Sequence, residues 1–454
     1  MALITNAPRG TQDVLPKDSH KWHTIERILL DTAEAFGYHE IRFPTFEHTE
    51  LFLRSVGDTT DVVQKEMYTF LDKGERSITL RPEGTAGTAR AVLEHGLLND
   101  ILPLKVCYLT SCFRYEKPQA GRLREFHQFG VEMFGPAAPQ ADAELMALAR
   151  AALMRLGVEG LTLKINSIGC PDCRADYHKA LHDYFEAHKN DLCATCNDRL
   201  AKNPMRILDC KNKSCKVITA DAPLITDYLC PDCKEHFSSV QSALTAMGIP
   251  FELDPTIVRG LDYYTRTVFE LVSGLPGAQG TVCGGGRYDG LIEELGGNPT
   301  PGLGFAIGLE RLLLFMEHVG AAFQSDRPCD LYLAGMGAEA AALVVKLAQR
   351  LREDGFYPEI DLMGRSLKAQ MKYADKLGAK FSIVIGDNEI AAGEAKLKNM
   401  KTGEQQIIPL GDAFMEHFYT ASLNDGFSEA TSALENLLEG MDSNQLKGNE
   451  NDAK

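Results

Sequence analysis

The chain has 454 residues, enough for two or three domains, and its 44% hydrophobic and 24% charged residues are typical of a globular protein. No apolar run reaches about 18 residues, and residues 1–10 lack a basic flank before an apolar stretch. We therefore expect a cytoplasmic protein with no membrane helix and no secretory signal. The formal net charge of -16 argues against bulk attraction to nucleic acid, although salt screening beyond about 8–10 Å leaves room for a local basic strip.

The first third of the chain alternates between helical and extended patterns. Apolar side chains at helical spacing before Gly37 predict a helix, and Pro44 suits the edge or the end of the extended stretch that follows. Aromatic and β-branched residues then predict two strands around a polar, turn-forming loop. The predicted elements are a helix over 20–36, an extended stretch over 40–46, strands over 106–115 and 124–134 around the loop 117–121, and a helix over 144–156.

The composition changes twice further along the chain. Residues 166–240 are rich in cysteine and charge and poor in β-branched runs, which indicates an insertion. Strand character returns over 256–272, and a glycine-rich segment and a helix over 309–318 follow. Beyond a polar boundary near residue 320, strands and helices alternate and predict a separate α/β domain of about 100 residues. The end of the chain is polar and is predicted to be disordered.

The two strands near residue 115 carry side chains suited to a nucleotide. Arg114 can form a bidentate contact with a phosphate, and Arg122 adds a second cation across the loop. Phe126 offers a stacking face for a base, and Glu116 offers an acceptor for an exocyclic amine. The alternative for this segment is a charged hairpin with surface salt bridges.

A second candidate nucleotide segment spans residues 302–311, where glycines alternate with apolar residues before a helix that starts with Glu-Arg. Glycines would let a ligand approach the strand backbone closely, and Arg311 could meet a terminal phosphate. The glycines lie within the strand pattern, whereas a dinucleotide-binding turn follows its strand, so we reject that interpretation.

Together with residues 37–44, these two segments resemble, in order, the three signature motifs of class II aminoacyl-tRNA synthetases. Three more segments look like those special to histidyl-tRNA synthetases: Thr-Leu-Arg-Pro-Glu-Gly-Thr at 79–85, Ile-Val-Arg-Gly-Leu-Asp-Tyr-Tyr at 257–264 and Cys-Gly-Gly-Gly-Arg-Tyr-Asp-Gly-Leu at 283–291. The similarity runs from Pro8 through the C-terminal α/β domain and covers most of the chain.

This resemblance implies an α+β fold, in which an antiparallel sheet forms the catalytic core and a C-terminal α/β domain binds the anticodon. It implies a catalytic domain in two parts, 1–165 and 241–325, a Cys-rich insertion at 166–240, an anticodon-binding domain at 326–425, and a helix end with a disordered tail at 426–454. The first motif implies a homodimer, since a symmetric interface is the usual solution.

The implied activity is that of a histidine–tRNA ligase. ATP, with Mg²⁺, and L-histidine would form histidyl-adenylate and pyrophosphate, and histidine would then pass to the 3′ end of histidine tRNA. The resemblance assigns catalysis to Arg259 and Arg114, with Arg259 neutralising charge on the α-phosphate. It assigns ATP binding to Arg114, Glu116, Arg122, Phe126 and Arg311.

The resemblance also implies a pocket for histidine. Acceptors for the α-amino group match Glu83, Thr85 and Gln128, and partners for the imidazole match Glu132 and Tyr264. The full predicted set is Arg81, Glu83, Thr85, Gln128, Glu132, Tyr263 and Tyr264. The alternative for the two tyrosines is an aromatic pair in the core.

Eight of the twelve cysteines fall in the insertion, mostly as Cys-x-x-Cys pairs. In a reducing compartment this spacing indicates metal before disulfides, and four thiolates suit tetrahedral zinc. Two ions, one ion with spare thiols, or reduced cysteines packed in a helical domain all remain open, and a catalytic zinc is not expected. The candidate ligands are Cys170, Cys173, Cys193, Cys196, Cys210, Cys215, Cys230 and Cys233.

A local basic strip lies in the C-terminal domain. Its lysines recur every four residues and so share one helical face, which suits tRNA phosphates, whereas the alternative is a solvated surface. The residues are Arg365, Lys368, Lys372 and Lys376, followed by Lys380.

Three other functions compete with this interpretation. A regulatory subunit of ATP phosphoribosyltransferase shares the core, but it typically lacks the catalytic arginine and the anticodon-type domain, and both are present here. A class II synthetase for another amino acid would not explain the segment 257–264. A zinc-dependent nucleic-acid binding protein would explain the cysteines but not the nucleotide-site residues.

Overall fold

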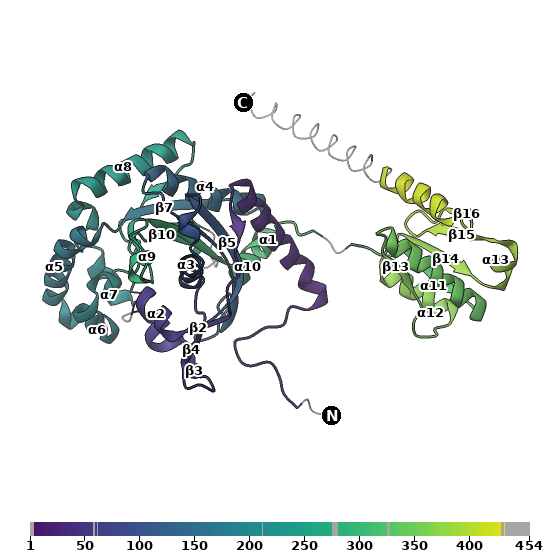
Figure 1. Ribbon diagram of the computed structural model, residues 1–454, viewed down its shortest axis with the longest axis horizontal. Coiled ribbons are helices and arrows are strands. Elements are labelled where there is room, and N and C mark those ends of the chain that lie inside the picture. The colour runs from purple at the N-terminus through teal and green to yellow at the C-terminus, as the bar shows by residue number, and fades with distance from the viewer. Residues whose placement is uncertain are drawn as a thin grey trace, which may run out of the picture. The chain divides into compact units, whose positions relative to one another are not determined.

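The structure is a computed structural model, which describes residues 4–57, 60, 62–210, 212–274, 280–324, 327–427 and 431. The chain divides into two compact units, residues 1–325 and 326–454 (Figure 1). The tail predicted at 426–454 lies outside the described residues except for 426, 427 and 431.

An eight-stranded sheet organises the first unit, in the order β1-β5-β6-β11-β10-β9-β7-β8. All neighbouring pairs are antiparallel except the two outermost, β1 with β5 and β7 with β8. The strands are β1 (His39–Glu40), β5 (Leu104–Phe113), β6 (Glu125–Phe134), β11 (Gly302–Gly308), β10 (Thr281–Arg287), β9 (Thr265–Ser273), β7 (Leu161–Ser167) and β8 (Glu252–Leu253). The predicted antiparallel core of the class II synthetases is confirmed.

Four helices pack against this sheet and build the main core: α1 (Pro16–Ala35), α4 (Pro139–Arg155), α8 (Pro231–Ala246) and α10 (Leu309–Val319). Their apolar stripes meet apolar strand residues, and Leu29, Leu148 and Phe129 are fully buried there. Burial of each such side chain contributes about 1.5–3 kcal/mol to the free energy of folding. The sheet is therefore rigid where it carries the site.

A buried ion cluster ties three of these elements together. Arg287 of β10 donates from Nη2 to Asp142 Oδ2 of α4 at 2.5 Å, and His236 Nε2 of α8 lies 3.3 Å from the same oxygen. Burial alone would raise the pKa of Asp142, but His236 and Arg287 hold it below its ordinary value. Removing one partner of such a cluster leaves a buried charge without compensation.

A smaller sheet, in the order β2-β4-β3, stands beside the main one. It comprises β2 (Phe46–His48), β4 (Ser77–Leu80) and β3 (Tyr68–Leu71), and it is accompanied by α2 (Thr49–Ser55), a π-helix (Val62–Glu66), α3 (Thr85–Glu94), a 3₁₀ turn (Leu97–Asn99) and α9 (Leu291–Glu294). The extended stretch predicted at 40–46 is therefore divided between two sheets.

The Cys-rich insertion lies between β7 and β8, and the regular secondary structure between these strands is entirely helical in its described residues. Its elements are α5 (Pro171–Ala187), α6 (Ala194–Lys202) and α7 (Lys213–Thr219), with 3₁₀ turns at Lys189–Asp191, Pro204–Ile207 and Ile225–Tyr228, before α8. Tyr177, Leu181 and Phe185 recur every four residues on α5 and are buried. Their cluster continues into Tyr263 and Tyr264 of the main body, so the insertion shares a core with the candidate site.

The second unit is a five-stranded sheet in the order β13-β12-β14-β15-β16. Its first three strands are parallel and its last two antiparallel. The elements are β12 (Leu331–Gly335), α11 (Ala338–Glu353), β13 (Pro358–Ile360), α12 (Leu367–Lys376), β14 (Phe381–Ile385), α13 (Asp387–Ala392), β15 (Glu394–Asn399), β16 (Gln405–Pro409) and a helix over 414–427. The predicted alternation of strand and helix is present. Among the described helices of the whole chain, none combines the length and apolarity needed to span a membrane.

Candidate active site

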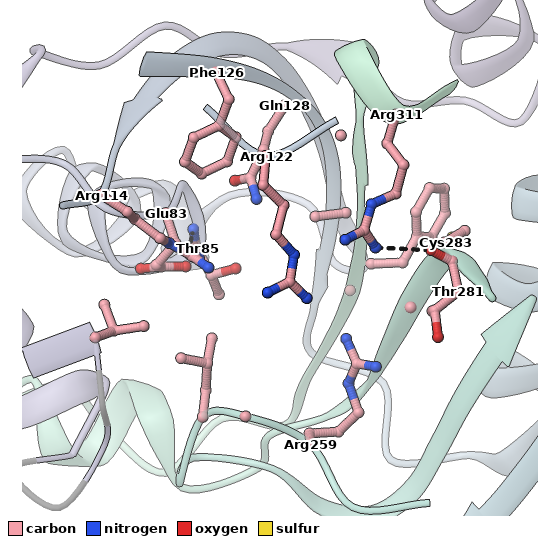
Figure 2. Close-up of a pocket in the computed structure, with 18 of the residues that line it drawn as sticks. Glu83, Thr85, Arg114, Arg122, Phe126, Gln128, Arg259, Thr281, Cys283 and Arg311 are labelled. Atoms are coloured by element: carbon pink, nitrogen blue, oxygen red, sulfur yellow. Dashed lines mark hydrogen bonds between the residues drawn. The ribbon is translucent and has the colours of Figure 1, made fainter. Parts of the chain in front are cut away.

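A cavity of about 440 Å³ opens on the main sheet, and its lining comes from β6, β10, β11 and the loops beside them. This volume is within the range of small-ligand sites. Figure 2 shows the guanidinium groups of Arg122, Arg259 and Arg311 converging on its centre, with Phe126 at one side. Three cations facing one hollow suit a polyanionic ligand.

Arg114 lies at the end of the β5–β6 hairpin, close to Phe126. Its Nε donates to the carbonyl of Pro82 at 2.8 Å, and its guanidinium lies 5.3 Å from the Phe126 ring centroid. These two contacts fix the plane of the guanidinium. Arg114 is therefore oriented before any ligand arrives, which lowers the cost of binding.

Arg311 and Arg122 approach the cavity from opposite elements. Arg311, in the first turn of α10, donates from Nη1 to the carbonyl of Thr281 at 3.0 Å. Burial lowers the pKa of the Arg311 guanidinium, and the neighbouring Arg122 lowers it further. Arg122 lies 3.6 Å from the carboxylate of Glu116. A bound anion would offset the electrostatic repulsion between these two cations.

Arg259 lies across the cavity from Arg114. Its Nη1 donates to Glu270 Oε1 at 2.5 Å, and Glu270 also accepts from Thr281 Oγ1 at 2.7 Å. A Cβ at Gly284 would lie 2.5 Å from Arg259 Nη1, so any larger residue at this position would displace the Arg259 guanidinium. Among the described residues, the buried Nε of Arg259 has no hydrogen-bond partner. A buried donor of this kind is available to an acceptor on a ligand.

On the opposite side of the cavity, Glu83 precedes α3. Its carboxylate accepts from the backbone N–H groups of Thr85 at 2.7 Å and Ala86 at 2.8 Å. Burial raises the pKa of the Glu83 carboxyl, while these N–H donors act in the opposite direction. The carboxylate is thus placed at the helix N-terminus, where negative charge is favoured.

The carboxylate of Glu132, on β6, accepts hydrogen bonds from three hydroxyl groups, and the residue is 1% exposed. It accepts from Thr85 Oγ1 at 2.7 Å, from Tyr108 Oη at 3.2 Å and from Tyr288 Oη. Burial raises the pKa of Glu132 to about 8, although the hydroxyl donors lower it. A Cβ at Gly304 would lie 2.0 Å from Glu132 Oε2, so only glycine fits at this position of β11.

The tyrosine pair closes the same end of the cavity. The Tyr263 and Tyr264 rings lie 4.7 Å apart, and the Tyr263 ring lies 5.4 Å from the Tyr288 ring. Arg259 lies 5.6 Å from the Tyr264 centroid. Gln128, on the neighbouring strand, accepts from Cys112 Sγ at 3.3 Å. The tyrosines thus contribute to the core and also line the cavity.

Most of the predicted ligand-binding residues line this one cavity: Glu83, Thr85, Arg114, Glu116, Arg122, Phe126, Gln128, Arg259, Tyr263, Tyr264 and Arg311. Glu132 lies directly behind the lining. Arg81 also lies outside it, because its guanidinium donates to the carbonyls of Ser111, Phe43 and Pro44 at 2.6–3.0 Å. In this arrangement the Arg81 guanidinium holds backbone carbonyls beside the cavity, and its contact with histidine stays a prediction.

The lining residues without a predicted role include four with polar side chains: Tyr108, Arg206, Tyr288 and Glu310. Tyr288 belongs to the glycine-rich segment 283–291 and could have been found there. Glu310 precedes Arg311 and is held by the backbone N–H of His127 at 2.9 Å. Tyr108 in mid-strand and Arg206 in the insertion carry no local signal.

The eight cysteines of the insertion form two groups of four, each with all sulfurs within 4.8 Å of one another. The inner cluster comprises Cys170, Cys173, Cys230 and Cys233. The outer cluster comprises Cys193, Cys196, Cys210 and Cys215. This grouping was left open by the spacing alone.

The basic strip occupies α12 and the residues before it. Its three lysines are exposed: Lys368, Lys372 and Lys376. Arg365 donates from Nη1 to Asp361 Oδ1 at 2.9 Å and lies 4.5 Å from the Tyr373 ring centroid, and Lys380 lies 3.9 Å from Asp330. The lysine face of α12 is thus the part of the strip most open to a partner.

Comparison with known proteins agrees with the fold. Residues 10–312 match the family model described as "Histidyl-tRNA synthetase", and residues 330–416 match "Anticodon binding domain". The histidine–tRNA ligase of Acetivibrio thermocellus is 57% identical over 90% of this chain and 98% of its own. That of Clostridioides difficile is 51% identical over 90% of this chain and 97% of its own.

A solved structure is similar as well. The apo histidyl-tRNA synthetase of S. aureus superimposes with a TM-score of 0.79 at 43% identity, covering 91% of this chain and 100% of that one. This likeness extends over both units. The chain belongs to the histidyl-tRNA synthetase family of class II aminoacyl-tRNA synthetases.

Proposed function

We propose that this protein is a histidine–tRNA ligase, which activates L-histidine with ATP and transfers it to the 3′ end of histidine tRNA. The observation that carries the proposal is the cavity itself. Cations from separate elements face one another across it, and a buried Glu–Tyr network closes one end. The family membership agrees with this division into an anion side and an amino-acid side.

In the first step, a carboxylate oxygen of histidine forms a bond to the α-phosphorus of ATP, and the bond from that phosphorus to the bridging oxygen breaks as pyrophosphate leaves. Negative charge develops on the α-phosphate, which would lie between Arg114 and Arg259. The pyrophosphate leaving group would contact Arg122 and Arg311. Catalysis of this kind is mostly positioning and electrostatic stabilisation. Arg114 is already oriented by Phe126, so it loses little freedom on binding.

Phe126 offers its face to the adenine, and Glu116 offers an acceptor beside it. Mg²⁺ accompanies ATP and is usually held by one or two carboxylates together with substrate phosphates and water. Glu116 and Glu310 line the cavity with Arg311 and fit that pattern. The ion would add charge neutralisation to that of the arginines.

Histidine recognition requires acceptors for an ammonium group and two partners for the imidazole. Glu83, Thr85 and Gln128 are the proposed partners of the α-amino group. Tyr264 is proposed to meet the imidazole, and Glu132 is proposed to act on it through the hydroxyls that it collects. A site with buried polar partners can reject analogues that lack a hydrogen bond by about 10⁴–10⁵-fold.

For the transfer step, we propose that the exposed lysines of α12 contact tRNA phosphates in the second unit. The proposed divisions are a catalytic domain at 1–165 and 241–325, the insertion at 166–240, and the anticodon-binding domain at 326–425. The division of the chain near residue 325 supports the last of these boundaries.

We also propose a homodimer built around the first motif. Phe46 and Phe70 lie on one face of the adjoining small sheet and are 56% and 47% exposed. Exposed apolar side chains on one face are typical of protein interfaces. A symmetric dimer is the usual arrangement that covers them.

The insertion is further proposed to hold zinc in a structural role. None of its eight cysteines lines the cavity. A catalytic zinc keeps an open coordination position towards its substrate, whereas a set of four thiolates is closed. Zinc would therefore serve the fold of the insertion.

The experiment for the main proposal is ATP–pyrophosphate exchange with a panel of amino acids and no tRNA. Exchange is expected with histidine alone. Arg259→Ala should lower its rate by about 10²–10³-fold, the usual cost of removing one preorganised charge donor. Arg54→Ala is the control, because Arg54 pairs with Glu50 on the surface of α2.

Two results would overturn the assignment. Exchange with another amino acid would indicate a different class II synthetase. Absence of exchange with every amino acid, from protein with an intact melting transition, would favour the regulatory paralogue.

A further inference from the structure

We propose that the helical insertion binds two Zn²⁺ ions, one in each four-cysteine cluster, and that these ions fix the loop over residues 259–264. The second half of this proposal rests on the proposed function, because that loop carries Arg259 and the two tyrosines assigned to histidine. The first half concerns metal content alone. The two halves are tested by different measurements.

The sulfur spacing of the inner cluster fits a tetrahedral ion. Cys170 Sγ lies 3.5 Å from Cys173 Sγ and 4.0 Å from Cys230 Sγ. Four sulfurs at about 2.3 Å from a central zinc lie about 3.8 Å from one another. The observed separations fall on both sides of this value, and every sulfur of the set lies within 4.8 Å of the others.

The backbone around the inner cluster is arranged for thiolates. Each Cys-Pro-Asp-Cys segment starts a helix, with its first cysteine at the N-cap and its proline in the first turn. The N-termini of α5 and α8 therefore meet at the cluster and place two positive dipole ends near it. The N–H of Cys230 donates to Cys173 Sγ at 3.1 Å. These donors offset the net negative charge of four thiolates around one Zn²⁺.

The outer cluster repeats this design. Cys193 Sγ lies 3.8 Å from Cys210 Sγ, at the edge length of a zinc–thiolate tetrahedron. The N–H of Cys193 donates to Cys215 Sγ at 3.3 Å, and that of Asn212 to Cys210 Sγ at 3.4 Å. The whole outer set lies within the sequence enclosed by the inner one. Two ions, one enclosed in sequence by the other, would add to the stability that the buried apolar residues of the insertion provide.

The inner cluster is tied directly to the tyrosine loop. Arg174, the residue after Cys173, donates from Nη1 to the carbonyl of Tyr264 at 3.1 Å. The backbone before the cluster pairs with the residues after that loop, since the N–H of Arg266 donates to the carbonyl of Gly169 at 2.9 Å. Gly169 has a φ of +67°, and a Cβ there would lie 2.6 Å from Cys173 Cβ. The ion site, Arg174 and Tyr264 thus form one continuous unit.

Residues that follow α6, the helix that begins at the outer cluster, form hydrogen bonds with the same loop nearer its start. Asn203 donates from Nδ2 to Asp262 Oδ1 at 3.3 Å, and Arg206 donates from Nη2 to the carbonyl of Gly260 at 3.4 Å. Both residues follow α6, whose N-cap is Cys193. Arg206 also lines the cavity. Side chains that follow each cluster in the sequence therefore form hydrogen bonds with residues 260–264.

Metal content tests the first half of the proposal. The full chain, purified under reducing conditions without added chelator, should contain two zinc ions by mass spectrometry of the metal. Cys230→Ser and Cys210→Ser should each lower the content to one, while Cys329→Ala, in the second unit, should leave it at two. Replacement by Co²⁺ should produce the thiolate charge-transfer absorption of a tetrahedral site.

Three results would overturn the two-ion assignment. The first is zero or one ion in the unmodified chain, and the second is loss of both ions from either single variant. The third is the presence of all eight cysteines as four disulfides in the reduced preparation. None of these readings depends on activity, so the proposed function could fail while the ions remain.

The positioning role is tested with Arg174→Ala, and Lys179→Ala is the matched control on the exposed face of α5. Loss of the charged hydrogen bond to Tyr264 should raise the KM for histidine about tenfold or more in the exchange assay. The KM for ATP should change less than twofold, and zinc content should stay at two. Equal histidine KM values in the two variants would refute the role of Arg174, as would a parallel rise in the KM for ATP.

Discussion

Replacing Glu132 with glutamine should change how stability depends on pH. The carboxyl is fully buried and is surrounded by the hydroxyls of Thr85, Tyr108 and Tyr288. Burial raises its pKa to about 8, so the folded protein holds it protonated at neutral pH. The unfolded chain ionises the same group near its ordinary value of 4.5. Folding therefore takes up a proton between these two values.

The magnitude follows from the two pKa values. Below pH 4.5 both states are protonated, and the contribution of Glu132 to stability is fully present. As the pH rises towards about 8 only the unfolded state loses the proton, so stability falls by about 1.4 kcal/mol for each pH unit. Over the whole window this amounts to about 5 kcal/mol. Above about pH 8 the folded carboxyl also ionises and the slope ends.

Glutamine cannot titrate, so its free energy of unfolding should lack this slope. The difference between Glu132→Gln and the unmodified chain should shift in favour of glutamine by about 4 kcal/mol between pH 5 and pH 8. Urea unfolding can be followed through Trp22, the single tryptophan, which packs against the core of the first unit. Glu235→Gln, on the exposed side of α8, is the control substitution. A difference for Glu132→Gln that stays constant across this pH range would refute the reasoning.

Three further predictions concern packing, charge and tRNA. Gly304→Ala would place a Cβ 2.0 Å from Glu132 Oε2, so we expect a loss of at least about 1–3 kcal/mol of stability and weaker histidine exchange, measured by thermal melting and by exchange. Asp142→Asn leaves the fully buried Arg287 with Asp289 as its remaining carboxylate partner and should cost up to about 3–5 kcal/mol in urea unfolding, and an unchanged midpoint would contradict this. Changing the three exposed lysines of α12 to alanine should weaken tRNA binding and reduce the slope of log affinity against log salt by about two to three, while exchange without tRNA stays the same.

The fold class and the family were predictable because their signals are local. Each class II motif is a short segment whose residue types fit one strand or hairpin. The second motif becomes the β5–β6 hairpin and the third becomes β11, which pairs with β6. The strand order of the sheet was not predictable, because β6 pairs with β11 across about 170 residues of intervening chain. Local patterns report which segments are strands and not which strands meet.

The same limit applies to the orientation of individual site residues. Arg81 and Glu83 occupy one short segment, and both were expected at the histidine. The backbone turns Glu83 towards the cavity and Arg81 towards three carbonyls, a choice made by the neighbouring strands. The grouping of the cysteines also depends on tertiary structure. Four of them lie at two helix N-termini that are separated by almost the whole insertion.

The position of Glu132 has a consequence for selectivity. A protonated carboxyl carries one donor and keeps acceptor capacity, and the hydroxyls of Tyr108 and Tyr288 can each do either. A neutral network of this kind can match a neutral imidazole, which itself has one donor and one acceptor nitrogen. It cannot compensate the desolvation of a lysine or arginine side chain, because no unpaired negative charge is present in this network to receive it. The burial that raises the pKa of Glu132 would therefore also discriminate against cationic amino acids, and an ionised carboxylate at the same position would lose that discrimination.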